Sequence, residues 1–375
     1  MTFERTPLRV GVLGAGTVGG EVLRAFLDRS PRLAPADGQP LVLAGVAVRD
    51  VARARAAGVP DDLLTDAPAH LVASPDIDVL VEVMGGQEPA RTLILGALAS
   101  GKAVVTANKA LLAAHGPELE AASRSSGAPL RFEASVGGGT PVLSPLASDL
   151  AANRVTSVRG IVNGTTNYIL TAMAREGLAY GDVLADAQAR GYAEADPTAD
   201  VEGLDPAAKL VILIRLAFGA WIDPAAVERR PMVRGGGRGA AGITGVTAED
   251  VAACIDQGRV LKLVASASVL DDGTIEASVL PTAVFGATAL ATTDGVLNRV
   301  EIEASPVGSV AFAGPGAGGA ATSSAVLGDL VAIARGGSST WAGLPAAVER
   351  SGIAVRAPSG ETFEAPSGAC YPTAE

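Results

Sequence analysis

A glycine-rich turn between a strand and a helix constrains this chain most. Leu8–Leu13 is an apolar run that predicts a strand, and Glu21–Leu27 is helical in pattern. The residues between them have the form GxGxxG, which is weak evidence by itself. In this position it is typical of a parallel α/β sheet with a dinucleotide pyrophosphate at a helix N-terminus. A turn that only packs helix on strand is the alternative. The expected cofactor-binding residues of the turn are Gly14, Gly16, Thr17, Val18 and Gly19.

The end of the second expected strand, Leu41–Val48, bears on which cofactor is bound. Arg49 and Asp50 follow this strand directly. An arginine at this place can hold the 2′-phosphate of NADP, whereas an aspartate can hold the free 2′-hydroxyl of NAD. Both cofactors therefore stay open, and Arg49 favours NADP or dual use.

Further strands lead to a lysine at the same sheet edge. Buried strands are predicted at Asp78–Val83 and Ala103–Thr106, with a helix over Thr92–Ser100 between them. Ala103–Thr106 is followed by Ala107, Asn108 and Lys109. Strand ends on this side of a doubly wound sheet face the ligand, so Lys109 is a candidate for chemistry. A surface lysine at a helix start is the alternative.

A run of carboxylates in front of a helix provides the other candidate chemistry. Five acidic residues precede or begin this helix, and Lys209 follows four residues after the last of them. The helix is predicted to have Asp205 as N-cap and Gly219 just past its end. Apolar neighbours and the helix dipole disfavour an ammonium there, whereas the acids favour it, so Lys209 is a candidate proton donor and acceptor. A solvated acidic loop with a surface Lys209–Asp205 pair is the alternative. The acids are Glu194, Asp196, Asp200, Glu202 and Asp205.

The rarity of lysine supports the chemical interpretation. The chain has 29 Lys+Arg, of which only Lys102, Lys109, Lys209 and Lys262 are lysines. Arginine is thus the default cation, and a lysine among carboxylates indicates a need for a titratable amine.

The net charge and the residue composition exclude several classes of protein. A net charge of −11 argues against nucleic acid or an anionic membrane surface as a partner. No apolar run is long enough to span a membrane, and the start of the chain lacks a signal-peptide layout. Cys254 and Cys370 form no disulfide framework, so we expect a reducing cytoplasm. His70 and His115 without a cysteine cluster predict no catalytic zinc site.

The second half of the chain reads as a different domain. A strand over Ser157–Val162 runs into Asn163 and a helix ending near Gly177. Later runs predict an antiparallel sheet that suits a subunit interface, and residues 234–242 read as a flexible linker. The fold class expected is α/β, with a dinucleotide-binding domain (1–134) completed by a returning helix (314–336). A catalytic and dimerisation domain (135–313) and a C-terminal tail (337–375) account for the rest. The runs are 261–270, 275–280, 295–304 and 309–313, with a further first-domain strand expected at Leu130–Ala134.

Six segments of the chain resemble homoserine dehydrogenase, from about Leu8 to Arg335. NGTTNYIL and GLDPAAK are highly specific to that family. The resemblance implies NAD(P)-linked interconversion of L-homoserine and L-aspartate 4-semialdehyde in the threonine, methionine and isoleucine pathway. It also implies a homodimer through the middle domain, with a tetramer left open. The segments are GVLGAGTVGG (11–20), VVTANKALLA (104–113), EASVGGGTPV (133–142), NGTTNYIL (163–170), GYAEADPTADVEGLDPAAKL (191–210) and GPGAGGAATSSAV (314–326).

The resemblance also implies roles for single residues. Lys209 looks like the proton donor and acceptor, with Asp205 orienting it. Glu194 looks like the partner of the substrate ammonium, Asp200 joins it in substrate binding, and Lys109 lies beside substrate and nicotinamide. Gly318 matches a late glycine near the cofactor. The residues matching the family's loop for a monovalent cation (Na⁺ or K⁺), mostly through backbone carbonyls, are Glu133, Val136, Gly138 and Thr140.

Four rival functions are weaker. No tyrosine has a lysine four residues on, as the short-chain dehydrogenases require. A semialdehyde dehydrogenase needs a thiolate, but Cys254 falls in a probable helix and Cys370 in the tail. A histidine-based dehydrogenase would depend on His115 alone. The rival from another class is a non-catalytic NAD(P)-binding regulator of the same fold.

The tail after Arg335 raises a question of regulation. Many long members of the family carry a C-terminal ACT module that senses threonine. The tail is too short for such a domain, so we expect no threonine inhibition through one.

Overall fold

The computed structural model describes residues 6–347 and 354–374, which form two compact units. The first unit comprises residues 1–149 and 317–345, and the second comprises residues 150–316 and 346–375. The parts of the expected first domain and tail that fall on residues 1–5, 348–353 and 375 lie outside the described residues.

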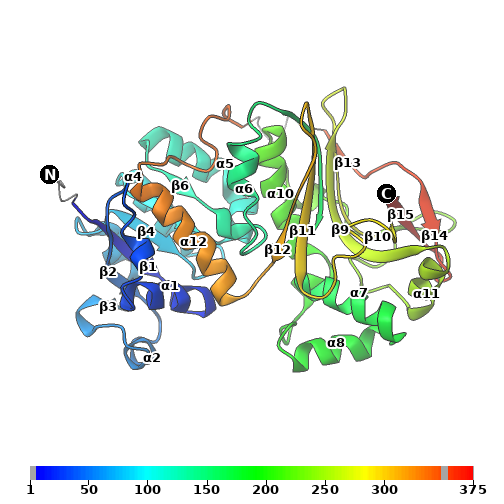
Figure 1. Ribbon diagram of the computed structural model, residues 1–375, viewed down its shortest axis with the longest axis horizontal. Helices are drawn as coiled ribbons and strands as arrows, with labels where there is room; N and C mark the ends of the chain where they lie inside the picture. The colour runs from blue at the N-terminus through cyan, green and yellow to red at the C-terminus, as the bar shows by residue number, and fades with distance from the viewer. Residues whose placement is uncertain (1–5, 348–353, 375) are drawn as a thin grey trace. The chain divides into compact units, whose positions relative to one another are not determined.

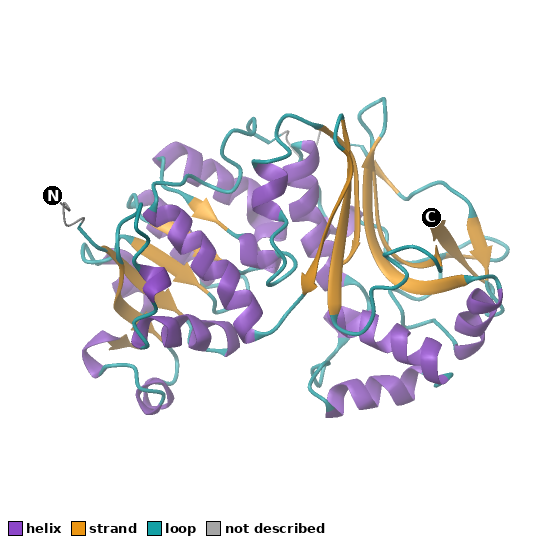
Figure 2. Cartoon of the chain, in the orientation of Figure 1, coloured by secondary structure: helices purple, strands orange, loops and turns teal. Residues whose placement is uncertain are grey.

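The first unit is built on a parallel sheet flanked by helices (Figures 1 and 2). Its strand order is β3-β2-β1-β4-β5-β6. Its strands are β1 (Leu8–Leu13), β2 (Leu41–Ala47), β3 (Leu64–Thr65), β4 (Val79–Glu82), β5 (Ala103–Thr106) and β6 (Leu130–Arg131). Its helices are α1 (Thr17–Leu27), α2 (Val51–Ala56), α3 (Pro68–Ala73), α4 (Ala90–Ala99), α5 (Lys109–Ser126), α6 (Leu143–Ala147) and α12 (Gly319–Ala334), with short 3₁₀ turns at Pro31–Leu33, Asp61–Leu63 and Glu133–Ser135.

The strand order confirms the predicted doubly wound sheet. The order reverses between β1 and β4, so right-handed crossovers place the helices after β1 and β4 on opposite faces. Accordingly, α1 packs with α12, while α4 packs with α3 and α5. Ligands of such sheets bind outside the carboxyl ends of the strands at the point of reversal.

Helix α1 follows from the spacing of its apolar residues. The buried positions Gly19, Val22, Leu23 and Phe26 recur at intervals of three and four, so they form one face. This face packs against Val10 and Val12 of β1, which are fully buried. The core therefore fixes the N-terminus of α1 directly after the end of β1.

The first unit extends beyond the expected boundary at residue 134. The Glu133 carboxylate accepts hydrogen bonds from the backbone N–H groups of Val142, Leu143 and Ser144 at 2.7–2.8 Å, which ties α6 to the sheet. The predicted strand Leu130–Ala134 is correspondingly too long. β6 stops at Arg131, because the Glu133 N–H bonds the Asp329 carboxylate of α12 at 2.8 Å instead of a neighbouring strand.

Helix α12 returns to the first unit, as predicted for 314–336. Asp329 is buried and accepts from Arg131 Nε at 2.7 Å. Burial raises the pKa of the Asp329 carboxyl to about 6, although the Arg131 guanidinium opposes this shift. The helix is thus held by a buried ion pair in addition to its apolar face.

The second unit contains a mixed, mostly antiparallel sheet with the order β12-β11-β7-β9-β10-β15-β14 (Figure 1). Its strands are β7 (Arg154–Ile161), β8 (Met232–Val233), β9 (Arg259–Val269), β10 (Ile275–Phe285), β11 (Leu297–Ser305), β12 (Gly308–Pro315), β13 (Val355–Arg356), β14 (Thr362–Glu364) and β15 (Ala369–Ala374). Its helices are α7 (Gly164–Glu176), α8 (Tyr180–Ala189), α9 (Thr198–Val201), α10 (Leu204–Phe218) and α11 (Ala248–Asp256), with a 3₁₀ turn at Pro224–Ala226. Helices α7, α10 and α11 pack against the sheet.

The described part of residues 337–375, which was expected as a C-terminal tail, is divided between the two units. Trp341 is buried in the first unit, with its ring 5.0 Å from that of Phe132. From residue 354 onwards, β13 and β15 pair with β10 of the second unit. Tyr371 is buried and donates a hydrogen bond to Asp250 of α11 at 2.8 Å. The segment's few apolar residues suffice because they join existing cores.

The expected flexible linker at 234–242 is also wrong. Residues 235–237 are glycines with positive φ, which close a tight turn. The Arg234 N–H donates to the Gly368 carbonyl at 2.7 Å, and β8 pairs with β15. The glycines therefore shape a turn that binds the C-terminal segment.

Among the described residues no helix is long and apolar enough to cross a membrane.

Candidate active site

The glycine-rich turn has the geometry of a dinucleotide loop. A side chain at Gly19 would come within 2.1 Å of the Gly14 carbonyl oxygen, so this glycine allows α1 to pack on the turn. Gly14 has a φ of +104°, which favours glycine. At Gly16 an added Cβ would meet nothing within 4 Å, and Gly16 and Thr17 are exposed. The start of α1 is exposed and has no side-chain cap, so its first N–H groups can bind an anion.

A second helix begins beside this turn. A Cβ at Gly319, the first residue of α12, would lie 2.7 Å from the Thr17 carbonyl oxygen, so the two helix starts are in contact. Gly318 caps α12 with a φ of +109° and has open space where its side chain would be. Two helix N-termini thus meet at the predicted cofactor edge of the first unit.

Arg49 and Asp50, the two residues expected to contact the adenosine ribose or its 2′-phosphate, follow the end of β2 directly. The Asp50 carboxylate accepts from the Arg53 N–H at 2.9 Å and caps α2. Arg49 is exposed at the strand end. Asp50 thus has a structural task in addition to any contact with the ribose, and both residues are exposed.

The ends of β4 and β5 are held by a buried carboxylate that the sequence interpretation missed. Glu82 is fully buried and accepts from Thr106 Oγ1 at 2.6 Å and from the Met84 N–H at 2.9 Å. Asn108 caps α5 and donates to the Gly86 carbonyl at 2.6 Å. Lys109 is half-buried at the first position of α5. The two loops are thus fixed to each other beside Lys109.

The loop predicted to hold a cation passes a chemical test of fit. Thr140 is buried, and within the described part of the chain its hydroxyl has no hydrogen-bond partner. Gly137 and Gly138 have positive φ, which bends the backbone tightly around the Thr140 N–H, bonded to the Gly137 carbonyl at 2.8 Å. The Glu133 carboxylate is taken up by α6, so Glu133 can offer a cation only its carbonyl. Among the described residues no cluster of three His, Cys, Asp or Glu side chains could hold a metal ion.

In the second unit Lys209 forms the buried centre of the acidic segment. Its side chain is 9% exposed, and Nζ donates to Asp205 Oδ2 at 2.8 Å and to the Val162 carbonyl at 2.6 Å. The interpretation of Lys209 and Asp205 as an ion pair on the surface is therefore wrong. Asp205 is also not the N-cap of α10: Gly203 caps it with a φ of +78°, and the Asp205 carboxylate turns towards Lys209 instead.

An asparagine at the start of α7 completes this cluster. Asn163 Nδ2 donates to Asp200 Oδ1 at 2.7 Å and to Asp205 Oδ2 at 2.8 Å. Thr165 Oγ1 donates to the Tyr192 carbonyl at 2.8 Å and lies 3.1 Å from Asp200 Oδ2. The structure thus brings Lys209, Asp205 and Asp200 together around the end of β7.

The remaining acids of the segment differ from these. Glu194 is exposed on the loop after α8, and its backbone carbonyl accepts from Gln188 Nε2 at 3.0 Å. Asp196 is exposed and accepts from Thr198, whose hydrogen bonds hold the pKa of this carboxyl below its ordinary value. Glu194 therefore presents its carboxylate to solvent two residues after Tyr192.

Two of the four lysines are structural. Lys102 is buried, and its ammonium donates to the carbonyls of Ser74 and Ile77 at 2.6 and 2.9 Å. Lys262 is fully buried among polar groups of α7 and the loop after β10. Rarity of lysine alone thus did not identify chemistry. Burial raises the pKa of the Cys254 thiol to about 12, which removes it as a thiolate nucleophile.

Glu82, Asn163 and Thr165 are the residues that sequence reasoning left without roles. For Asn163 and Thr165 a signal existed, because both lie in the NGTTNYIL segment directly after a predicted strand. Glu82 is the last residue of a buried strand, where a carboxylate needs a partner. Glu82 ends a strand, and Asn163 and Thr165 follow one, which is where this kind of site collects its residues.

Comparisons with known protein families cover most of the chain. Residues 14–133 match the model of the NAD-binding domain of homoserine dehydrogenase, and residues 141–331 match the model of homoserine dehydrogenase. The homoserine dehydrogenase of Mycobacterium tuberculosis is 48% identical over 339 residues, which are 89% of this chain and 74% of that protein. That of Corynebacterium glutamicum is 43% identical over 350 residues, with 90% and 76% covered.

Solved structures agree with this match. A homoserine dehydrogenase from Thiobacillus denitrificans superposes with a TM-score of 0.82 at 40% identity, covering 89% of this chain and 74% of that chain. A hyperthermophilic archaeal homoserine dehydrogenase in complex with NADPH gives a TM-score of 0.71 at 27% identity, covering 87% and 97%.

Proposed function

Because this chain belongs to the homoserine dehydrogenase family, we propose that Lys209 is the group that moves the proton in its reaction. The chain is an NAD(P)-dependent oxidoreductase that interconverts L-homoserine and L-aspartate 4-semialdehyde, and a non-catalytic regulator is not favoured at this identity. The observation that carries the assignment is the buried Lys209 amine, which is bonded to one carboxylate and one carbonyl.

The chemistry of the two directions fits one amine in two protonation states. When bound, the nicotinamide accepts hydride from the alcohol carbon or returns it to the aldehyde carbon. In oxidation, neutral Lys209 takes the hydroxyl proton. In reduction, the Lys209 ammonium donates a proton to the oxygen on which negative charge develops. Asp205 orients the amine in both states.

The first test is the reaction itself. The purified chain is expected to reduce NADP or NAD only when homoserine is present, followed by the absorbance of the reduced cofactor. Binding of the cofactor without homoserine-dependent turnover would favour the regulator instead. The same assay with Na⁺, K⁺ or neither tests the proposed cation.

We propose that Glu194 and Asp200 bind the substrate and that Glu194 pairs its ammonium group. Support comes from the exposed carboxylate of Glu194 near Tyr192, whose carbonyl Thr165 ties to Asp200. Lys109, at the start of α5, is proposed to contact the substrate and the nicotinamide.

Glu194→Gln is expected to raise the KM for homoserine more than it lowers kcat. The neutral amide keeps the size of the side chain but loses the charge that attracts the ammonium. Steady-state kinetics with saturating cofactor measure both constants. A fall in kcat at unchanged KM would instead assign Glu194 to the transition state.

We propose that the chain uses NADP, alone or together with NAD, and that the exposed Arg49 at the end of β2 contacts the 2′-phosphate. Arg49→Ala is expected to weaken NADP by roughly 1–3 kcal/mol, the range of a charge-assisted contact, and to leave NAD unaffected. Cofactor titrations by fluorescence give the two dissociation constants. Equal losses for NADP and NAD would show that Arg49 acts structurally.

We also propose that a monovalent cation binds the loop of Glu133, Val136, Gly138 and Thr140, mainly through carbonyl oxygens. The unpartnered Thr140 hydroxyl supports this. Thr140→Val is expected to keep the fold, since no hydrogen bond is lost, but to reduce the rise in unfolding temperature caused by Na⁺ or K⁺. An undiminished rise in the unfolding temperature would show that the Thr140 hydroxyl is not a ligand of the cation and that carbonyl oxygens alone bind it.

Two further proposals concern assembly and location. We propose a homodimer formed through the second unit, where β12 is an edge strand of the sheet. Light scattering of the purified chain tests for the dimer and for any tetramer. We propose a cytoplasmic location, supported by the two free cysteines, one of them buried.

A further inference from the structure

We propose that Asn163 is a positioning residue that holds the carboxylates of Asp200 and Asp205 and thereby sets the place of the Lys209 amine. This inference rests on the proposed proton-transfer role of Lys209. Asn163 lies at the junction of β7 and α7 and is 5% exposed. It is not proposed to contact the reacting atoms.

The polar atoms of the Asn163 amide are all engaged. Its Nδ2 donates to Asp200 Oδ1 at 2.7 Å and to Asp205 Oδ2 at 2.8 Å, while its Oδ1 accepts from the Thr166 N–H and hydroxyl at 2.9 Å each. Chemistry fixes this orientation, because a backbone N–H can only donate and ionised carboxylates can only accept. A flipped amide would lose every one of these bonds to the carboxylates and the N–H.

The neighbouring residue completes the hold on Lys209. The Val162 carbonyl accepts from Lys209 Nζ at 2.6 Å, and Asp205 Oδ2 accepts from both Lys209 Nζ and Asn163 Nδ2. Two consecutive residues therefore touch the amine and both carboxylates. Asn163 reaches the amine only through Asp205, which is why its role is one of positioning.

The need for Asn163 is greatest when Lys209 has lost its proton. The ammonium compensates the charge of Asp205, whereas the neutral amine does not, so the repulsion between Asp200 and Asp205 increases when Lys209 loses its proton. Like charges at close range repel strongly in a partly buried site. The Asn163 amide does not titrate, so its two N–H groups hold the carboxylates in both states of Lys209.

The competing structural explanation is that Asn163 only caps α7. An N-cap needs one side-chain oxygen, and aspartate serves that purpose as well as asparagine. Asn163→Asp therefore keeps the cap to Thr166 but removes both N–H donors and adds a third negative charge. The substitution separates the two roles at one position.

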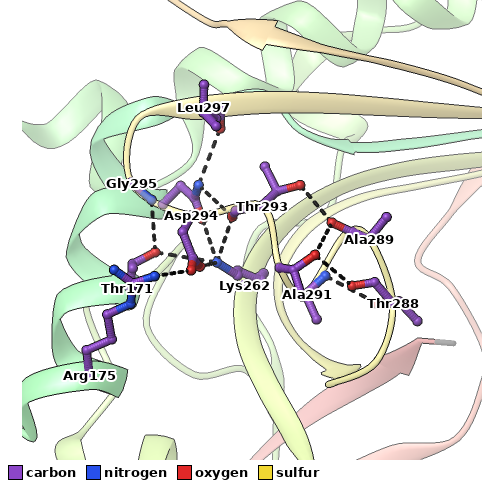
Figure 3. Close-up of polar contacts among 12 residues, drawn as sticks. Thr171, Arg175, Lys262, Thr288, Ala289, Ala291, Thr293, Asp294, Gly295 and Leu297 are labelled. Carbon is purple, nitrogen blue, oxygen red and sulfur yellow. Dashed lines mark hydrogen bonds and ion pairs between the residues drawn. The ribbon is translucent and has the colours of Figure 1, made fainter.

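Asn167, one turn further along α7, provides a matched control. Its Nδ2 donates to the carbonyls of Thr293 and Leu297 at 3.0 and 3.3 Å, and its Oδ1 accepts from Lys262 at 3.1 Å. Lys262 also donates to Thr293 and Asp294, as Figure 3 shows. Asn167→Asp makes the same chemical change four residues after Asn163. There it lies in a cluster of hydrogen bonds that holds the loop between β10 and β11.

The first experiment compares the pH dependence of homoserine oxidation in the two variants. In Asn163→Asp the limb where kcat rises with loss of the Lys209 proton is expected to move to higher pH by roughly one unit, because the added carboxylate stabilises the ammonium. Asn167→Asp is expected to lower the unfolding temperature without moving this limb. An unmoved limb in Asn163→Asp, at retained unfolding temperature, would overturn the proposal.

The second experiment is a double-mutant cycle with Asn163→Ala and Lys209→Ala. Alone, Asn163→Ala is expected to lower kcat by roughly 10–100-fold through misplacement of the amine. On the Lys209→Ala background it is expected to cause little further loss, because the amine it positions is gone. A full, additive loss would overturn the positioning role. Near-normal kcat in Lys209→Ala itself would instead reject the proposed role of Lys209.

Discussion

Lys209→Ala is expected to lower kcat for homoserine oxidation by roughly 10²–10⁴-fold, the range of general acid–base catalysis. Affinity for the cofactor should change little, because Lys209 is proposed to act on the proton of the substrate and not to bind the cofactor. Stopped-flow or steady-state rates give kcat, and a cofactor titration of the same preparation serves as the control for folding. A loss of this size would place the proton at the amine, which donates to the Val162 carbonyl and the Asp205 carboxylate.

Lys209→Arg separates proton transfer from charge. The guanidinium keeps a positive charge beside Asp205 but does not release its proton, because its pKa lies far above the pH at which the enzyme works. Poor rescue of kcat is therefore expected. An arginine variant with near-normal kcat would show that Lys209 contributes charge alone, and the pH dependence assigned to it would belong to another group.

The parallel sheet could be predicted closely because its strands are continuous apolar runs with abrupt ends. Leu8–Leu13 and Ala103–Thr106 match β1 and β5 residue for residue. The expected strand Leu130–Ala134 failed because its last part bonds Asp329, 196 residues away. Local pattern defines a run, but a distant partner decides where its hydrogen bonds go.

In the candidate site, too, the sequence predicted the contact between near neighbours but not the contacts with distant residues. The i, i+4 spacing of Asp205 and Lys209 predicted an ion pair, and α10 forms it. The spacing did not reveal that the pair is buried or that Lys209 also donates to the Val162 carbonyl, 47 residues away in the chain. Asn163 had no predicted role, since its partners Asp200 and Asp205 lie 37 and 42 residues on.

Gly16→Ala is expected to weaken cofactor binding by at least tenfold while leaving the fold intact. Among the described residues an added Cβ at Gly16 meets no atom within 4 Å, and the residue's φ of −73° lies outside the left-handed region that requires glycine. The methyl group would instead occupy the space in front of the α1 N-terminus, where a pyrophosphate must approach the backbone closely. Titration of NADP and thermal unfolding of the unliganded protein measure the two effects separately.

Gly19→Ala is the matched control, in which the added methyl group is expected to disturb packing in the protein itself. Its Cβ would lie 2.1 Å from the Gly14 carbonyl oxygen, so α1 has to move off the turn, and the unliganded protein should lose stability as well as cofactor binding. The two alanines are three residues apart, yet one tests space for a ligand and the other tests packing. Unchanged NADP affinity in Gly16→Ala would contradict the assignment of the pyrophosphate to this turn.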